Sequence, residues 1–444
     1  MLFCIITAIS FSLPLVACKV KKEETLIQEK FVYDFDVKLT EKQAKINVKL
    51  GVVQTQSGAS RTFAFYPVKD HQISNSAEKK GNIAVNKVTA NGKDVEYEFD
   101  TKNFTVKVFE EHQKGDNTSY EFEYVINLVS NNSTLSFSDG QYLLYRFYPI
   151  PFDGEKCVFR FGQDNLTYPI FDFTAKVNLP KSWIALFTGE LLEDKREDLT
   201  HTVTVKGEGI RDFSVIASNA FVARSLVADT PIYYYFKSDK KYQSVLNTAE
   251  NAVNVFSEIF GESPFKELTV VKTAMDIDFL SLSKVVWIKD GLTEKETLDA
   301  LIKGIAGEWW KYKIDVKENY LSESLIGFSN MAYYLRSDDG KTFKQKVDEN
   351  KAYLEKLVVS GKQYALDIPL ENAESGYLST VGSLMWYDLY SLYGTELFDK
   401  LKTFANNYAG KTIGIDALFT AFDNDPKYLS VIRAWVDGSV ILSF

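Results

Sequence analysis

Few residues of this 444-residue chain have the types and spacing that catalysis or metal binding requires. Its three histidines are His71, His112 and His201, so nothing after His201 can supply an imidazole. The sequence contains no Gly-x-Ser-x-Gly turn and no Gly-x-x-x-x-Gly-Lys-Ser/Thr phosphate loop. Asp338-Asp339-Gly340 lacks the later ligands of a calcium loop, and Cys157 lies in an apolar run typical of a buried thiol. No catalytic pattern therefore emerges from the residues alone.

The composition is that of an acidic globular protein. Lys and Arg number 51 against 60 Asp and Glu, which gives a formal net charge of −9, and 45% of the residues are hydrophobic. This apolar content can offset the entropy of ordering the chain, so a disordered protein is excluded. The acidic balance and the absence of a long basic tract also exclude a nucleic-acid partner. The length predicts two or three domains.

The first eighteen residues predict a processed leader and a lipid anchor. Residues 1–18 form an apolar run that is shorter than the ~20 residues of a membrane-spanning helix. Its end, Leu15-Val16-Ala17-Cys18, resembles the lipobox of bacterial lipoproteins, which implies cleavage before Cys18 and acylation of that residue; an ordinary secretory signal is the alternative. A diacylated cysteine is held stably in a membrane. We expect a protein of the bacterial cell envelope, tethered by residues 19–30 to the outer membrane on its periplasmic or surface face.

The hydrophobic pattern divides the remaining chain into two halves. In residues 31–225 apolar and polar residues alternate in short runs, and Asn91-Gly92 is typical of a hairpin turn. From residue 226 the period lengthens to that of amphipathic helices. The expected helices are 242–261, 293–312, 322–337, 340–358, 380–394, 414–424 and 427–437. We predict an α+β fold: an N-terminal antiparallel β saddle or sandwich domain (31–225), then a mainly α domain with a small sheet (226–444).

Short motifs in both halves resemble those of one family, the gluzincin aminopeptidases related to aminopeptidase N. In the first half they are Phe147-Tyr148-Pro149, Asn178-Leu179-Pro180 with Trp183, and Ile210-Arg211-Asp212-Phe213-Ser214. In the second half they are Phe256-Ser257-Glu258-Ile259-Phe260-Gly261 with Pro264-Phe265, Glu308-Trp309-Trp310, and Leu321-Ser322-Glu323-Ser324-Leu325. The resemblance implies a β saddle domain followed by a thermolysin-like, peptidase-like domain.

The family's chemistry needs His-Glu-x-x-His on one helix and a further Glu on the next, because these side chains bind zinc and polarise the attacking water. Aligned on the tryptophan pair, Lys303 stands at the first His, Gly304 at the catalytic Glu and Gly307 at the second His. Glu323 remains as a vestigial third ligand, a few residues closer than is usual. The resemblance therefore implies a degenerate site with no catalytic residues, and we expect zinc and other cofactors to be absent.

Two further family positions are also altered. Thr273-Ala274-Met275-Asp276 resembles the Gly-Ala-Met-Glu stretch that holds the free amine of the substrate, so Asp276 is a candidate peptide-amine anchor. A polar residue at a strand end is the alternative interpretation of Asp276. The family's transition-state Tyr would align near Ser379, and Tyr377 is out of register.

Lys303 and Glu323 suggest a structural hypothesis. A buried unpaired carboxylate is strongly unfavourable, so an ammonium–carboxylate pair between these residues would replace the zinc ion. Exposure of Lys303 to solvent is the alternative. Gly304 and Gly307 are poor helix formers, and they leave either a void on their helix face or room for another segment to approach.

The expected function follows from the fold and the missing motif. We expect a membrane-anchored, extracytoplasmic lipoprotein that is a catalytically inactive pseudoenzyme and binds a peptide or an envelope protein as a scaffold. Two alternatives remain open. One is a residual or atypical metallo-aminopeptidase acting on peptides, and the other is a structural surface lipoprotein whose contacts lie outside the cleft.

Overall fold

A computed structural model of the chain describes residues 30–40, 42–65, 83–101, 103–128, 135–138, 140–152, 169–316, 318–337, 340–360, 364–367 and 376–440. The expected leader with Cys18, the tether up to residue 29, His71, Cys157 and Asp338-Asp339 lie outside these residues. Within the described ranges, no helix is both long and apolar enough to cross a membrane.

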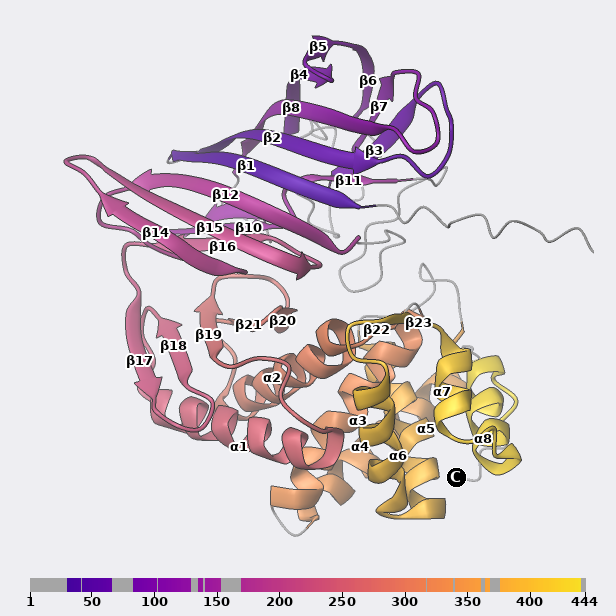
Figure 1. Cartoon of the computed structure of the whole chain (residues 1–444). Helices are drawn as coiled ribbons and strands as arrows, with labels where there is room; N and C mark the ends of the chain where they lie inside the picture. Colours follow the sequence, from indigo (N-terminus) through magenta and orange to yellow (C-terminus); the bar gives the residue numbers. More distant parts are fainter. Residues whose placement is uncertain are drawn as a thin grey trace, which may run out of the picture.

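The first half consists of β-sheets (Figure 1). An eight-stranded sheet has the order β14-β15-β12-β1-β2-β8-β4-β5. Its strands are β1 (Phe31–Thr40), β2 (Gln43–Val53), β4 (Ile83–Ala90), β5 (Lys93–Asp94), β8 (Asn117–Asn127), β12 (Phe171–Pro180), β14 (Glu190–Arg196) and β15 (Thr200–Ile210). Two four-stranded sheets accompany it. The strands of the first, in order, are β13 (Ile184–Phe187), β16 (Ser214–Ser218), β10 (Gln141–Tyr145) and β9 (Leu135–Ser138). Those of the second are β11 (Pro149–Pro151), β3 (Arg61–Phe65), β7 (Thr105–Phe109) and β6 (Glu96–Asp100).

The alternation of the sequence explains these strands. In β1 every second side chain from Phe31 to Leu39 is buried and the others are exposed, because successive residues of a strand point to opposite faces. Asn91 and Gly92 have φ angles of 52° and 75° between β4 and β5, as the expected hairpin turn requires. The sheet differs from a purely antiparallel one at a single pair, because β1 and β12 run parallel.

The second half is mainly helical. Its five-stranded sheet has the order β17-β18-β19-β21-β20, with β17 (Val222–Leu226), β18 (Ile232–Phe236), β19 (Leu268–Thr273), β20 (Phe279–Leu282) and β21 (Val285–Lys289). The helices are α1 (Tyr242–Phe260), α2 (Glu294–Gly307), α3 (Asn319–Ser337), α4 (Lys341–Val359), α5 (Tyr377–Tyr393), α6 (Glu396–Asn407), α7 (Ile415–Ala421) and α8 (Pro426–Asp437). Short strands β22 (Asp315–Val316) and β23 (Thr412–Ile413) pair in parallel. The predicted α+β fold, β-rich first and helical second, is confirmed.

Among the helices that the structure describes in this half, the helical pattern predicted all except α6. The missed helix carries its own signal, since its buried residues Leu397, Phe398, Leu401, Phe404 and Ala405 repeat at the helical period. The prediction at 293–312 is refined, because α2 ends at Gly307 and continues as a π-helical turn, η1 (Glu308–Lys313). Such turns are rare and often accompany functional sites.

The two halves meet through apolar and polar contacts. One buried cluster combines Leu143, Tyr145, Ile216 and Phe221 with Val271, Met275, Leu280, Leu282, Val285 and Trp287. A polar contact between the halves is the ion pair of 2.6 Å between the Arg211 guanidinium and the Asp315 carboxylate. The expected boundary between residues 225 and 226 falls within β17, which belongs to the sheet of the second half.

Candidate functional site

The motif positions lie on α2, whose start is fixed by its sequence. Thr293 and Glu296 form a capping box, in which the Thr293 hydroxyl accepts the Glu296 N–H (3.3 Å) and the Glu296 carboxylate accepts the Thr293 N–H (2.9 Å). This cap fixes the start of the helix. Further along α2, Lys303 is partly buried, and this burial, with Lys346 nearby, lowers the pKa of its ammonium below the usual range.

Gly304 and Gly307 face the β20–β21 hairpin. A Cβ atom at Gly304 would overlap a methyl group of Val286, and one at Gly307 would overlap the Ser281 hydroxyl and lie 2.8 Å from the Ser281 Cβ. The Ser281 hydroxyl donates a hydrogen bond to the Gly304 carbonyl oxygen (2.7 Å). Of the two expected outcomes, close approach of another segment is therefore the one observed. The hairpin fills the space that side chains at these two positions would need.

Glu323 on α3 has a different partner from the one expected. Its carboxylate lies 2.6 Å from the Lys311 ammonium, and the direct Lys303–Glu323 pair is not formed among the described residues. The side chain of α3 that faces Gly307 is Ile326, whose Cδ1 would lie 3.8 Å from a Cβ there. The hypothesis of a Lys303–Glu323 pair was wrong, because Glu323 pairs with Lys311 of η1 instead. The α-helical period could not predict η1.

Asp276 lies in the β19–β20 connection and is exposed. The neighbouring residues are anchored to the β domain, because the Gln141 side-chain oxygen accepts hydrogen bonds from the Thr273 hydroxyl (3.3 Å) and the Ala274 N–H (3.1 Å). The residue of this region that contacts the α2 glycines is Ser281, not Asp276. Sequence reasoning missed Ser281, because its contact depends on how the hairpin folds over the helix.

The positions considered for the transition-state tyrosine, Ser379 and Tyr377, also make packing contacts. A Cβ at Gly327 of α3 would overlap the Ser379 carbonyl oxygen of α5, so the two helices cross in close contact there. The Tyr377 hydroxyl donates to the Ala365 carbonyl oxygen (2.8 Å) and is buried. Ser379 therefore lies in the contact between α5 and α3, and Tyr377 joins α5 to residues 364–367.

Zinc does not fit the side chains at the motif positions. A zinc site needs three or four nitrogen, sulfur or carboxylate ligands in tetrahedral array. Gly304 and Gly307 have no side chain, Ser281 occupies the space beside them, and Glu323 is paired with Lys311. Elsewhere in the described ranges, no group of three or more His, Cys, Asp or Glu is placed to hold a metal ion.

A second cluster of polar groups begins directly after Gly307, at Glu308 of η1. Glu308 is 1% exposed, and its Oε2 accepts the Lys284 N–H (2.7 Å) while Oε1 has no hydrogen-bond partner in the described structure. Burial, reinforced by the negative charge of Asp212, raises the pKa of Glu308 to about 8. A charged residue directly before Trp309-Trp310 in an apolar helix was the sequence signal of this buried group.

Tyr312 connects this cluster to the β domain. Its hydroxyl lies within hydrogen-bond distance of the Asp212 carboxylate and of the Ser281 carbonyl oxygen (2.7 Å). Burial raises the pKa of Asp212 to about 6, against the opposing charge of Arg146. One oxygen of Asp212 has no hydrogen-bond partner, so two incompletely bonded carboxyl groups lie near each other in the interior.

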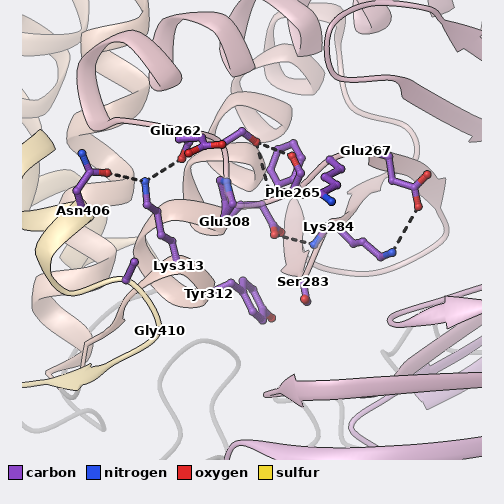
Figure 2. A pocket seen from close by; sticks show the side chains of 14 residues that line it. Glu262, Phe265, Glu267, Ser283, Lys284, Glu308, Tyr312, Lys313, Asn406 and Gly410 are labelled. Atoms are coloured by element: carbon purple, nitrogen blue, oxygen red, sulfur yellow. Dashed lines mark hydrogen bonds and ion pairs between the residues drawn. The ribbon is translucent and has the colours of Figure 1, made fainter.

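The cluster borders a hollow of about 900 Å³. Glu308, Tyr312 and Phe265 line its inner part, and the hairpin turn at Ser283 and Lys284 forms one side (Figure 2). Ser283 and Lys284 have positive φ angles of 37° and 63°, which allow the chain to reverse in two residues. The same hairpin therefore closes the glycine face of α2 and borders an open hollow at η1.

No protein-family model matches the chain, and no curated protein matches it in sequence. Solved structures do match in three dimensions. The M1 zinc metallopeptidase of Deinococcus radiodurans is 14% identical with a TM-score of 0.71, over 94% of this chain and 95% of that one. A mutant of it bound to a Tyr-Ser-Ala substrate matches with a TM-score of 0.69 at 14% identity, over 94% and 95% of the chains.

Legionella pneumophila aminopeptidase A, in complex with aspartic acid, matches at 12% identity with a TM-score of 0.70, over 92% of this chain and 49% of that one. At such low identity these matches concern the three-dimensional structure, and the order of the β-rich and helical halves agrees with them. The chain has the fold of the M1 zinc aminopeptidases.

Proposed function

We propose that this chain is a membrane-anchored binding protein that has the aminopeptidase fold without peptidase activity. The observation that carries the proposal is the packing of Gly304 and Gly307 against Val286 and Ser281. Hydrolysis by this fold family needs a metal-bound water and a general base at these positions. Here the positions have no side chains and no room for them.

The retained carboxylate supports the same conclusion. Glu323 is neutralised by Lys311 at 2.6 Å, and the α3 residue opposite Gly307 is the apolar Ile326. Lys303, partly buried on α2, would place a positive charge where a metal cation would otherwise lie. Each of these features opposes metal binding by a different physical means: steric overlap, neutralisation of a ligand, and electrostatic repulsion.

The binding role rests on the fold and on what remains open in it. A mutant of the Deinococcus radiodurans peptidase was solved with a Tyr-Ser-Ala substrate, so this fold can hold a tripeptide. In the present chain the hollow beside η1 is large enough for a small ligand or one side chain of a larger one. We propose a peptide or an envelope protein as the ligand, with Asp276 as a candidate contact for a peptide amine.

Membrane attachment is proposed from the sequence. Residues 1–18 end in Cys18 with the spacing of a lipobox, and acylation of that cysteine would hold the protein at the cell envelope. Membrane fractionation of the intact protein beside Cys18→Ser tests this. The proposal predicts that the variant moves to the soluble extract, and an unchanged membrane fraction would exclude lipid anchoring at Cys18.

The test of inactivity is a panel of aminoacyl-arylamide substrates, assayed with and without added zinc. We expect no cleavage above background by the purified protein. The matched control is Glu323→Gln, because trace peptidase from the host would remain unchanged in that variant. Zinc-dependent cleavage that Glu323→Gln abolishes would favour the residual metallo-aminopeptidase instead.

A further inference from the structure

The hollow beside η1 has a polar group in its inner part that the fold leaves incompletely bonded. Glu308 lines the hollow and is 1% exposed. Its Oε2 accepts the Lys284 N–H, whereas Oε1 has no hydrogen-bond partner in the described part of the chain. Buried carboxyl oxygens are normally hydrogen-bonded, and leaving one without a partner is unfavourable. The free oxygen is therefore a group that a hydrogen-bond donor would stabilise. Because protein atoms cover it, a donor from a ligand in the hollow needs a small rotation of the Glu308 side chain.

Lys266, Lys284 and Lys313 line the hollow, and none of the three supplies that donor. The Lys284 ammonium lies 3.4 Å from the Glu267 carboxylate. The Lys313 ammonium donates to the Glu262 carbonyl oxygen (2.8 Å) and the Asn406 side-chain oxygen (3.1 Å), as Figure 2 shows. Both are held at the rim by partners of their own.

The surroundings of Glu308 favour a cation. Asp212 is a second buried carboxyl near it, and its negative charge acts on Glu308. Phe265 and Tyr312 add aromatic rings to the lining. Aromatic faces accept the methylene groups and the positive charge of an alkylammonium ion, and a carboxylate accepts its N–H groups.

We propose that the hollow at η1 binds a primary alkylammonium group, which donates a hydrogen bond to Oε1 of Glu308 while its methylene groups contact Phe265 and Tyr312. The group can come from a free small amine or from a lysine side chain of a bound peptide. This inference refines the binding role proposed above and rests on it. It assigns that role a site distinct from Asp276 and from the glycine positions of α2.

Saturation-transfer NMR titration of the purified protein tests the charge requirement at pH 9, where Glu308, with its pKa of about 8, is ionised and an alkylammonium group keeps its proton. The probes are N-acetyl-lysine methylamide and its uncharged analogue N-acetyl-norleucine methylamide. Hydrogen bonds to charged groups predict that the lysine compound binds at least about tenfold more tightly. Equal binding of the two, or no binding of the lysine compound, would overturn the proposal without any variant being needed.

Variants then assign the site. In Glu308→Gln the amide oxygen can still accept the Lys284 N–H, so the turn keeps its hydrogen bond, while the carboxylate charge present at pH 9 is lost. We expect binding of the lysine compound to weaken about tenfold or more in this variant, and to stay within about twofold in the rim control Glu267→Gln. Equal weakening in both variants, or in neither, would show that Glu308 is not the contact.

A third probe, n-butylammonium, separates the two sources of the ligand. Binding comparable to that of the lysine compound supports a free amine, and much weaker binding supports a lysine side chain that needs its peptide backbone. The outcome is also separate from the question of catalysis. Failure of every ammonium probe with arylamide cleavage still absent would overturn the ammonium site and leave the proposed inactivity standing.

Discussion

Two adjacent stretches, the end of α2 and η1, contact the same hairpin but differ in the space beside them. At Gly304 and Gly307 the absence of side chains lets Val286 and Ser281 approach until no space remains. At Glu308–Lys313 the helix widens into a π turn, and a buried carboxyl lines a hollow of about 900 Å³. The comparison shows that packing can close one stretch of a helix while a polar opening remains a few residues away.

The largest effect should come from restoring a side chain to the closed stretch. Gly307→His forces an imidazole into the space of Ser281, so we expect a loss of about 3 kcal/mol or more of unfolding free energy. Chemical denaturation measures it. Gly51→Ala is the matched control, because a Cβ there meets only ordinary contacts of 3.8 Å and 3.9 Å. Equal losses in both variants would contradict the tight packing at Gly307.

A pH titration of stability should sharpen the description of the open stretch. The pKa of Glu308 is about 8 in the folded protein against an ordinary value of 4.5, so the folded state binds more protons between these values. Stability contributed by this group is therefore lost as the pH rises. The unfolding free energy of the wild type should fall relative to Glu308→Gln by about 2 kcal/mol from pH 6 to pH 8. Parallel curves would contradict the buried environment of Glu308.

Two lysines near the closed stretch should respond in opposite directions. Lys303→Met removes a partly buried ammonium whose pKa is lowered by burial, so we expect unchanged stability or a gain of about 1 kcal/mol. Lys311→Met leaves Glu323 without its partner and should lower stability by about 1 kcal/mol. Thermal unfolding of both variants at one pH provides the comparison. A clear loss of stability in Lys303→Met would contradict this account and favour a stabilising interaction of Lys303 with a carboxylate.

The smallest effect belongs to the rim of the hollow. Glu267→Gln removes an ion pair with Lys284 whose groups are 51% and 31% exposed. Exposed pairs contribute little, so the unfolding free energy should change by less than about 0.5 kcal/mol. A change as large as that in Glu308→Gln would mean that the rim and the interior of the hollow are not electrostatically distinct.

The sequence predicted the elements better than it predicted the site. Alternation and turn residues were sufficient for the strands, as Asn91-Gly92 shows, and the 3.6-residue period was sufficient for most helices. The contacts at the α2 positions depended on tertiary structure. Ser281 and Ile326 come together only when hairpin, α2 and α3 pack, and Glu323 pairs with Lys311 because η1 departs from the α-helical period.

The central claim is that the packing of α2 excludes a zinc site, and zinc content tests it most directly. The purified protein is incubated with excess zinc, freed of unbound metal by gel filtration, and analysed by inductively coupled plasma mass spectrometry beside Glu323→Gln. The account predicts well under one zinc per chain in both proteins. One zinc per wild-type chain that Glu323→Gln loses would contradict it.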